Sequence, residues 1–170
     1  CGVALSIMAT GAANLTGAAA YAYLERHPLL CVTECYGPSQ VQAMSLQKID
    51  HVQAFAAYCK DSITLGHADA GTQINRAIQL AMSEKPGPVH VDYPLDVGSL
   101  SSSSTGALPG TDDYLKIDGD LQKIVDLVNL AEKPLIIVGP TVLRQNAGLH
   151  IVDLAERLQS AIMVTSKARG

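Results

Sequence analysis

The chain has 170 residues, of which 48% are hydrophobic and 16% charged, so it can bury a substantial core in one domain, or in one domain and part of another. Its formal net charge of -4, without a cluster of Lys and Arg among aromatic residues, excludes nucleic acid as a partner. No apolar run reaches the roughly 18 residues that span a bilayer, so we expect no membrane contact and a cytoplasmic location.

Short apolar runs alternate with longer amphipathic ones along the first part of the chain. This pattern is typical of an α/β fold, in which crossover helices join the strands of a parallel sheet. We predict strands at residues 3–8, 29–33, 62–65 and 89–92. We predict helices at residues 12–26, 52–58 and 69–84. Residues 1–97 are therefore expected to form one α/β domain.

Serine, glycine and proline dominate residues 98–119, which bury too little apolar surface to order themselves and are predicted to be an interdomain linker. Helical periodicity returns after it, and we predict helices at residues 120–132 and 149–158. We predict strands at residues 135–138 and 162–165. Residues 120–170 are expected to begin a second, Rossmann-like α/β domain.

Four stretches of the chain combine strand, turn and helix signals. They are GVALSIMATGAANL at residues 2–15, LQKIDHV at 46–52, KPGPVHVDYPLDV at 85–97 and KPLIIVGP at 133–140. Their order resembles that of thiamine-diphosphate enzymes of the acetolactate synthase type. The first is similar to the family's strand, turn and helix, which usually read Gly-Val and then Ser-Gly-Pro-Gly-Ala-Thr-Asn-Leu. The chain thus resembles most of a pyrimidine-binding (Pyr) domain, of the thiamine-diphosphate-binding fold, followed by the start of the family's central domain.

The resemblance carries expectations about activity, cofactors and partners. It implies part of a lyase or transferase that decarboxylates or carboligates 2-oxo acids or related carbonyl compounds. It implies thiamine diphosphate and magnesium in the complete assembly, and FAD or ADP in the central domain. Because this family binds its cofactor between the Pyr domain of one subunit and the diphosphate-binding domain of another, it also implies a homodimer or homotetramer that includes the remaining parts of the enzyme.

The chain as given is expected to be an incomplete catalyst, with both ends lying inside domains. The family's catalytic glutamate lies upstream of the segment where this sequence starts, so no catalytic residue is assigned. The Gly-Asp-Gly…Asn metal motif is absent from the sequence, and no metal ligand is predicted. A non-catalytic α/β binding or assembly module derived from the same fold is the alternative. A nucleotide-binding α/β domain is a third reading, and it lacks the Gly-x-Gly-x-x-Gly turn.

The predicted cofactor-binding residues are Thr10, Gly11, Asn14 and Gln47. By motif, Thr10 takes the place of the family's proline, Gly11 that of its second glycine and Asn14 that of its asparagine, while Ala9 replaces the first glycine. This turn follows a strand and opens a helix, where open α/β sheets bind ligands. Gln47 matches the family's active-site glutamine. The alternatives are that Asn14 bonds within its own helix and that Gln47 is a solvated loop amide.

Several other polar residues are predicted to have no catalytic or metal-binding role. His51 is expected to pack or cap the short helix at residues 52–58 rather than to act as an acid or base. Glu34, at a strand end, is expected to be a solvated carboxylate. The remaining histidines are scattered without ligand spacing: His27, His67, His90 and His150.

Overall fold

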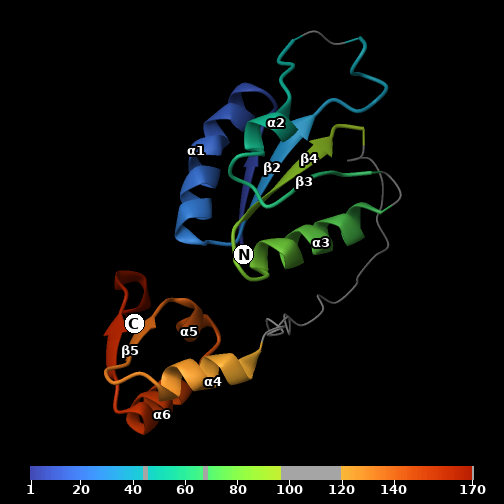
Figure 1. The fold of residues 1–170 in the computed structure, drawn as a ribbon. Coiled ribbons are helices and arrows are strands. Elements are labelled where there is room, and N and C mark those ends of the chain that lie inside the picture. The colour runs from blue at the N-terminus through green and yellow to red at the C-terminus, as the bar shows by residue number, and fades with distance from the viewer. Residues whose placement is uncertain (44–45, 67–68, 97–119, 170) are drawn as a thin grey trace. The chain divides into compact units, whose positions relative to one another are not determined.

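The computed structural model describes residues 1–43, 46–66, 69–96 and 120–169 (Figure 1). The chain divides into two compact units, Cys1–Leu115 and Lys116–Gly170. The predicted linker at residues 98–119 lies outside the described residues, so the boundaries at 97 and 120 stay predictions. Within the described part of the chain, no helix is both long and apolar enough to cross a membrane.

The first unit is built on a parallel sheet with the strand order β1-β2-β4-β3. Its strands are β1 (Gly2–Ser6), β2 (Leu29–Cys35), β3 (Ser62–Thr64) and β4 (Pro88–Pro94). Its helices are α1 (Thr10–Glu25), α2 (His51–Phe55) and α3 (Ala70–Met82). Each strand and helix predicted for this part of the chain is present, and the predicted α/β class is confirmed.

Helices cover both faces of this sheet (Figure 1). On one face, Ala12 and Ala19 of α1 and Phe55 of α2 pack against Cys31 of β2. On the other face, Leu30 of β2 lies in a second cluster, which α3 completes. Successive residues of a strand point to opposite faces, so adjacent positions of β2 serve the two cores. Packing of helices on both faces holds the sheet in place, including the carboxyl ends of its strands, where the candidate site lies.

Two strands are longer than predicted. β2 and β4 pair in register over seven residues, from Leu29 opposite Pro88 to Cys35 opposite Pro94. The predicted strands end at residues 33 and 92, and the second was expected to end before Pro94 because proline stops strand pairing. Thr33 and Asp92 face each other across the sheet and are both buried. Both strands thus continue past their predicted ends.

The second unit contains a parallel pair, β5 (Leu135–Val138) and β6 (Ala161–Val164), in register from Leu135 opposite Ala161. Its helices are α4 (Leu121–Asn129), α5 (Thr141–Arg144) and α6 (Gly148–Leu158), followed by the 3-10 turn η2 (Ser166–Ala168). The short α5 was not predicted as a separate helix. Asn146 has a left-handed backbone, with φ 54°, which ends α5 before α6 begins.

Candidate functional site

A cavity of about 130 Å³ opens at the carboxyl ends of β1, β2 and β4. Met8 follows β1, Cys35 ends β2, and Asp92 lies near the end of β4. The other lining residues come from the segment after β2 and from α2: Tyr36, Val41, Gln47, Lys48, Ile49 and His51. This is the edge of an open α/β sheet at which ligands are commonly bound.

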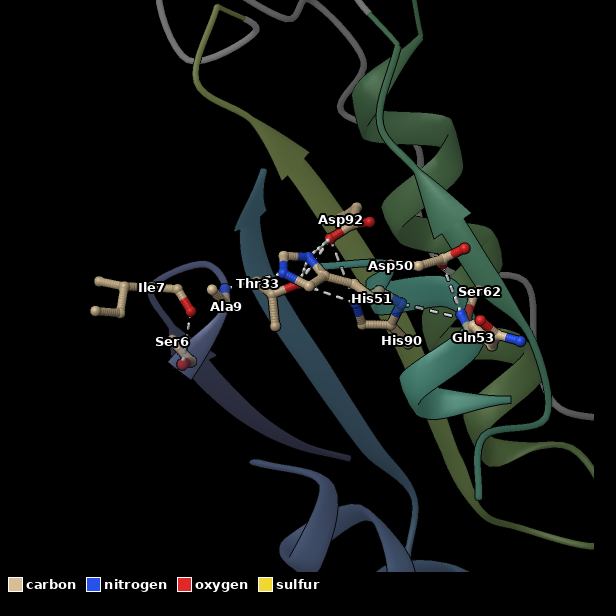
Figure 2. Close-up of polar contacts among 10 residues, drawn as sticks. All are labelled: Ser6, Ile7, Ala9, Thr33, Asp50, His51, Gln53, Ser62, His90 and Asp92. Atoms are coloured by element: carbon tan, nitrogen blue, oxygen red, sulfur yellow. Dashed lines mark hydrogen bonds and ion pairs between the residues drawn. The ribbon is translucent and has the colours of Figure 1, made fainter. Parts of the chain in front are cut away.

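Asp92 is the centre of a buried hydrogen-bond network beside this cavity (Figure 2). Its Oδ1 accepts a hydrogen bond from Thr33 Oγ1 at 2.7 Å and lies 2.8 Å from His51 Nδ1. His90 Nε2 lies 3.4 Å from the same oxygen and 2.8 Å from Thr33 Oγ1. The network therefore ties β2, β4 and the start of α2 together at one buried carboxylate.

The proton positions in this network follow from its one backbone donor. The Ala9 amide, which can only donate, lies 3.0 Å from His51 Nε2. Nε2 must therefore be the acceptor nitrogen, so the proton of the neutral imidazole sits on Nδ1 and is donated to Asp92. Because Thr33 gives its own proton to Asp92, its oxygen is free to accept from His90 Nε2.

His90 extends the network toward β3. Its Nδ1 lies 3.2 Å from Ser62 Oγ, and its ring is fully buried. The ring of Phe55 stacks on it, with centroids 4.3 Å apart and planes 9° from parallel. The bonded path therefore runs from Ser62 on β3 through His90 and Thr33 to Asp92, and then through His51 to the turn before α1.

The Asp92 carboxylate is held in its ionised form. Burial raises the pKa of Asp92, but the hydrogen bonds that it accepts, from His90 first and then from Thr33 and His51, lower it. Its pKa consequently lies below the ordinary value of 3.8. An ionised carboxylate accepts from several donors at once, which is the role that this position requires.

His90 was predicted to be one of several scattered histidines, and this is wrong, because its ring lies next to that of His51, with centroids 6.2 Å apart. One ring nitrogen of each histidine and a carboxylate oxygen of Asp92 lie within 4.8 Å of one another, close enough to share a metal ion. However, these atoms are already joined by hydrogen bonds, with Thr33 among them, and Mg²⁺ prefers a shell of oxygen ligands. We therefore interpret the cluster as a hydrogen-bond network.

A weak sequence signal pointed to this cluster. His90 and Asp92 are two residues apart in a strand, and such residues share one face of the sheet. His51, in contrast, had been expected to pack or cap its helix. It is indeed buried, but Asp50 is the capping residue, since its side chain accepts a 2.8 Å bond from the Gln53 amide. Nothing in the sequence placed Ala9 opposite the His51 ring.

The structure separates Gln47 from the other predicted cofactor-binding residues. Gln47 lines the cavity, and its backbone is left-handed with φ 52°. Thr10 and Asn14 are exposed on the first turns of α1 and do not line this cavity. A Cβ on Gly11 would overlap the Ser6 side chain and lie 2.7 Å from Ile7 Cγ1, so a side chain at this position would have to displace its neighbours. The cofactor role of all four residues stays a prediction.

Ala9 has a backbone conformation that disfavours any residue with a side chain. It is buried, it precedes α1, and its φ is 53° with ψ −100°. Residues held at such angles are strained by about 1 to 3 kcal/mol. By the family motif this is the position of a glycine, which adopts positive φ freely.

We therefore expect Ala9→Gly to raise the free energy of unfolding by about 1 kcal/mol, the relieved strain less the greater entropy of an unfolded glycine. Urea denaturation of both chains measures the change. Ala13→Gly is the matched control, because Ala13 is an exposed residue inside α1 and its replacement should destabilise by about 1 kcal/mol. Destabilisation by Ala9→Gly as large as that of the control would contradict this account.

Comparison with known proteins supports the assignment of a class. No family model matches the sequence. A solved structure from Mycobacterium smegmatis, assigned as a thiamin diphosphate-dependent enzyme, superposes with a TM-score of 0.77 at 21% identity. The match covers 96% of this chain and 32% of that one. The fold is therefore that of a thiamin diphosphate-dependent enzyme.

The sequence relatives of the chain are acetolactate synthases. The chain is 29% identical to an acetolactate synthase of Arthrospira platensis over 99% of its length, and 31% identical to an acetolactate synthase large subunit of Mycobacterium tuberculosis over 99%. It spans 31% and 32% of these relatives, or about a third of their length. The chain is thus homologous to acetolactate synthases over 99% of its own length, and the predicted resemblance is confirmed.

Proposed function

We propose that the first unit forms one wall of a thiamine diphosphate site, in an enzyme that decarboxylates or carboligates 2-oxo acids. The observation that carries this proposal is the place of Gln47. The family motif selected it as an active-site residue, and it lines the cavity at the carboxyl edge of the sheet with a left-handed backbone. Backbone strain of this kind concentrates at functional sites.

The size and chemistry of the cavity fit part of a site rather than a whole one. A volume of about 130 Å³ is below the roughly 300 to 1,000 Å³ of ordinary cofactor pockets. It suits a small group, such as one ring of the cofactor or a short 2-oxo acid. The nitrogen-rich cluster beside it is unsuited to magnesium and diphosphate. The metal, with the diphosphate, is thus proposed to bind outside the cavity.

Five of the residues that line the cavity have a defined contribution under this proposal. When bound, thiamine diphosphate supplies the electron sink for cleaving or forming a bond next to a carbonyl carbon. Gln47 offers an amide that both donates and accepts hydrogen bonds, and so orients a carbonyl or carboxylate group. Met8 and Ile49 add apolar surface that excludes water. The His51 and Asp92 pair holds the wall in place.

Homology favours an enzyme over the non-catalytic module, because the relatives matched over 99% of the chain are acetolactate synthases. Oligomerisation, the cytoplasmic location, and FAD or ADP binding by the second unit stay predictions. We also propose that pyruvate or a similar 2-oxo acid is the substrate.

The test is an assay of the full-length protein that carries this sequence, with pyruvate and with thiamine diphosphate and magnesium added together or withheld. We expect release of carbon dioxide that requires thiamine diphosphate, with acetolactate as the product of carboligation. Isothermal titration calorimetry with the cofactor and magnesium provides a second measurement. A full-length protein that binds no thiamine diphosphate and turns over no 2-oxo acid would refute the proposal.

A further inference from the structure

The buried network reaches the chain segment from which α1 starts. The Ala9 amide donates to His51 Nε2 at 3.0 Å, while the Ala9 carbonyl accepts the bond from the Ala13 amide at 2.8 Å that opens the helix. One residue thus joins the network to the first turn of α1. Both Ala9 and His51 are about 95% buried, so water cannot readily replace the bond between them.

We propose that His51 is a positioning residue whose neutral imidazole, with its proton on Nδ1, clamps the Ala9 turn, and that protonation of this ring releases the clamp. The relevance of the turn to the cofactor rests on the proposed function. The clamp itself is a property of this chain and is testable without any cofactor.

The geometry requires a ring with one donor and one acceptor nitrogen. Nδ1 donates to Asp92 at 2.8 Å while Nε2 accepts from Ala9, and only neutral imidazole does both. A second proton would sit on Nε2 and point at the Ala9 N–H, so two donors would face each other. The bond would then be lost.

Because the Ala9 backbone is strained, loss of the His51 bond is expected to change its conformation. A residue at φ 53° and ψ −100° stays there only when its surroundings hold it. The His51 bond is a directed contact to this backbone from outside its own helix. Without it, we expect Ala9 to relax toward ordinary angles and to move the amides of Thr10 and Gly11, which follow in the chain.

Charged and titratable groups from each neighbouring element bear on the protonation of His51. They are Asp92 and His90 of β4, Cys35 at the end of β2, Tyr36 after it, Lys48 in the preceding loop, and Asp50 at the cap of α2. Asp92 contacts ring Nδ1 at 2.8 Å, and the Ala9 amide contacts Nε2 at 3.0 Å. Cys35 stays neutral, because burial first, with Asp92 and Asp96, raises its pKa to about 12. The turn before α1 contacts the ring through the Ala9 amide, which is uncharged.

The test is ¹H–¹⁵N nuclear magnetic resonance of the 170-residue chain, with labelled histidine and alanine, over a pH series. Near neutral pH we expect the Nδ1–H tautomer at His51 and slow exchange of the Ala9 amide. When the ring is protonated at lower pH, the protection of the Ala9 amide, corrected for the pH dependence of exchange in an unfolded chain, should fall roughly tenfold or more, in step with the ring.

Two variants separate the clamp from simple packing. His51→Gln keeps a donor and an acceptor but does not titrate, so Ala9 protection should persist and lose its pH dependence. His51→Leu keeps bulk without polar atoms, so protection should fall roughly tenfold or more at every pH. His27→Gln is the control: His27 is exposed and lies at the far end of α1, so this variant should behave like the unmodified chain.

Three results would overturn the clamp: an Nε2–H tautomer at His51, unchanged Ala9 exchange in His51→Leu, or Zn²⁺ binding that shifts the His51 and His90 nitrogens, which would show a metal site instead. Should His51→Leu fail to fold, the pH series and His51→Gln still decide. A clamp observed in a chain whose full-length protein binds no thiamine diphosphate would refute the proposed function and leave the clamp standing.

Discussion

Replacing Asp92 with leucine is expected to lower the free energy of unfolding by about 3 kcal/mol. The change removes the common acceptor of Thr33 and His51 and leaves buried donors without a partner. Each unsatisfied buried donor costs about 1 to 3 kcal/mol. Urea or guanidinium denaturation of the 170-residue chain measures the loss.

Two control variants make this result specific. Asp92→Asn keeps the shape and one carbonyl oxygen, so it should destabilise less than Asp92→Leu does. Asp50→Asn replaces an exposed carboxylate by a residue that also caps helices, and should change stability by no more than about 0.5 kcal/mol. An Asp92→Leu chain as stable as the Asp50→Asn chain would show that the network contributes nothing to folding.

The lowered pKa of Asp92 also predicts how stability changes with acid. A carboxyl group whose pKa is lower in the folded chain than in the unfolded chain binds its proton less tightly when folded. Its contribution is present above the ordinary value of 3.8 and is lost as the pH falls through the lower folded value. The stability difference between the unmodified chain and Asp92→Asn should therefore shrink as the pH falls below about 4.

Replacing Gln47 with alanine in the full-length protein is expected to reduce turnover by roughly tenfold to more than a hundredfold, with little change in melting temperature. A polar contact to a reacting group contributes about 1 to 3 kcal/mol to the transition state. Gln47 is exposed and leaves no core position empty, so folding should be nearly unaffected. Alanine also retains the demand of a side chain at φ 52°, so backbone strain is matched.

The measurement is steady-state kinetics with thiamine diphosphate, magnesium and pyruvate, together with a thermal melt. Gln42→Ala is the matched control, because Gln42 is exposed on the same loop but is not among the residues that line the cavity. We expect the control to retain full activity. Unchanged kinetic constants and cofactor affinity for Gln47→Ala would return Gln47 to the role of a solvated loop amide.

The local pattern of apolar and polar residues was enough to predict most of the strands and helices. Short apolar runs mark the positions of five strands: β1, β2, β4, β5 and β6. Such runs are visible in the sequence because a paired strand in an α/β fold packs apolar side chains against a helix. The same reasoning missed the extensions of β2 and β4, because pairing was expected to stop before Pro94, which lies opposite Cys35 at the end of both strands. It also missed the break at Asn146, although asparagine is one of the residues that adopt a left-handed backbone just after a helix.

The sequence by itself determined the α/β class, the order of elements and the resemblance to acetolactate synthases, because these depend on periodicity and on motifs that local chain geometry requires. It also selected Gln47, through a motif. Only the tertiary structure decided the buried network of Ala9, Thr33, His51 and Asp92. The two partners of each contact in it are 18 to 59 residues apart in the sequence. Parallel register brings Thr33 opposite Asp92, and the loop before α2 returns His51 to that edge. No local pattern encodes such a meeting, because it depends on how distant elements pack.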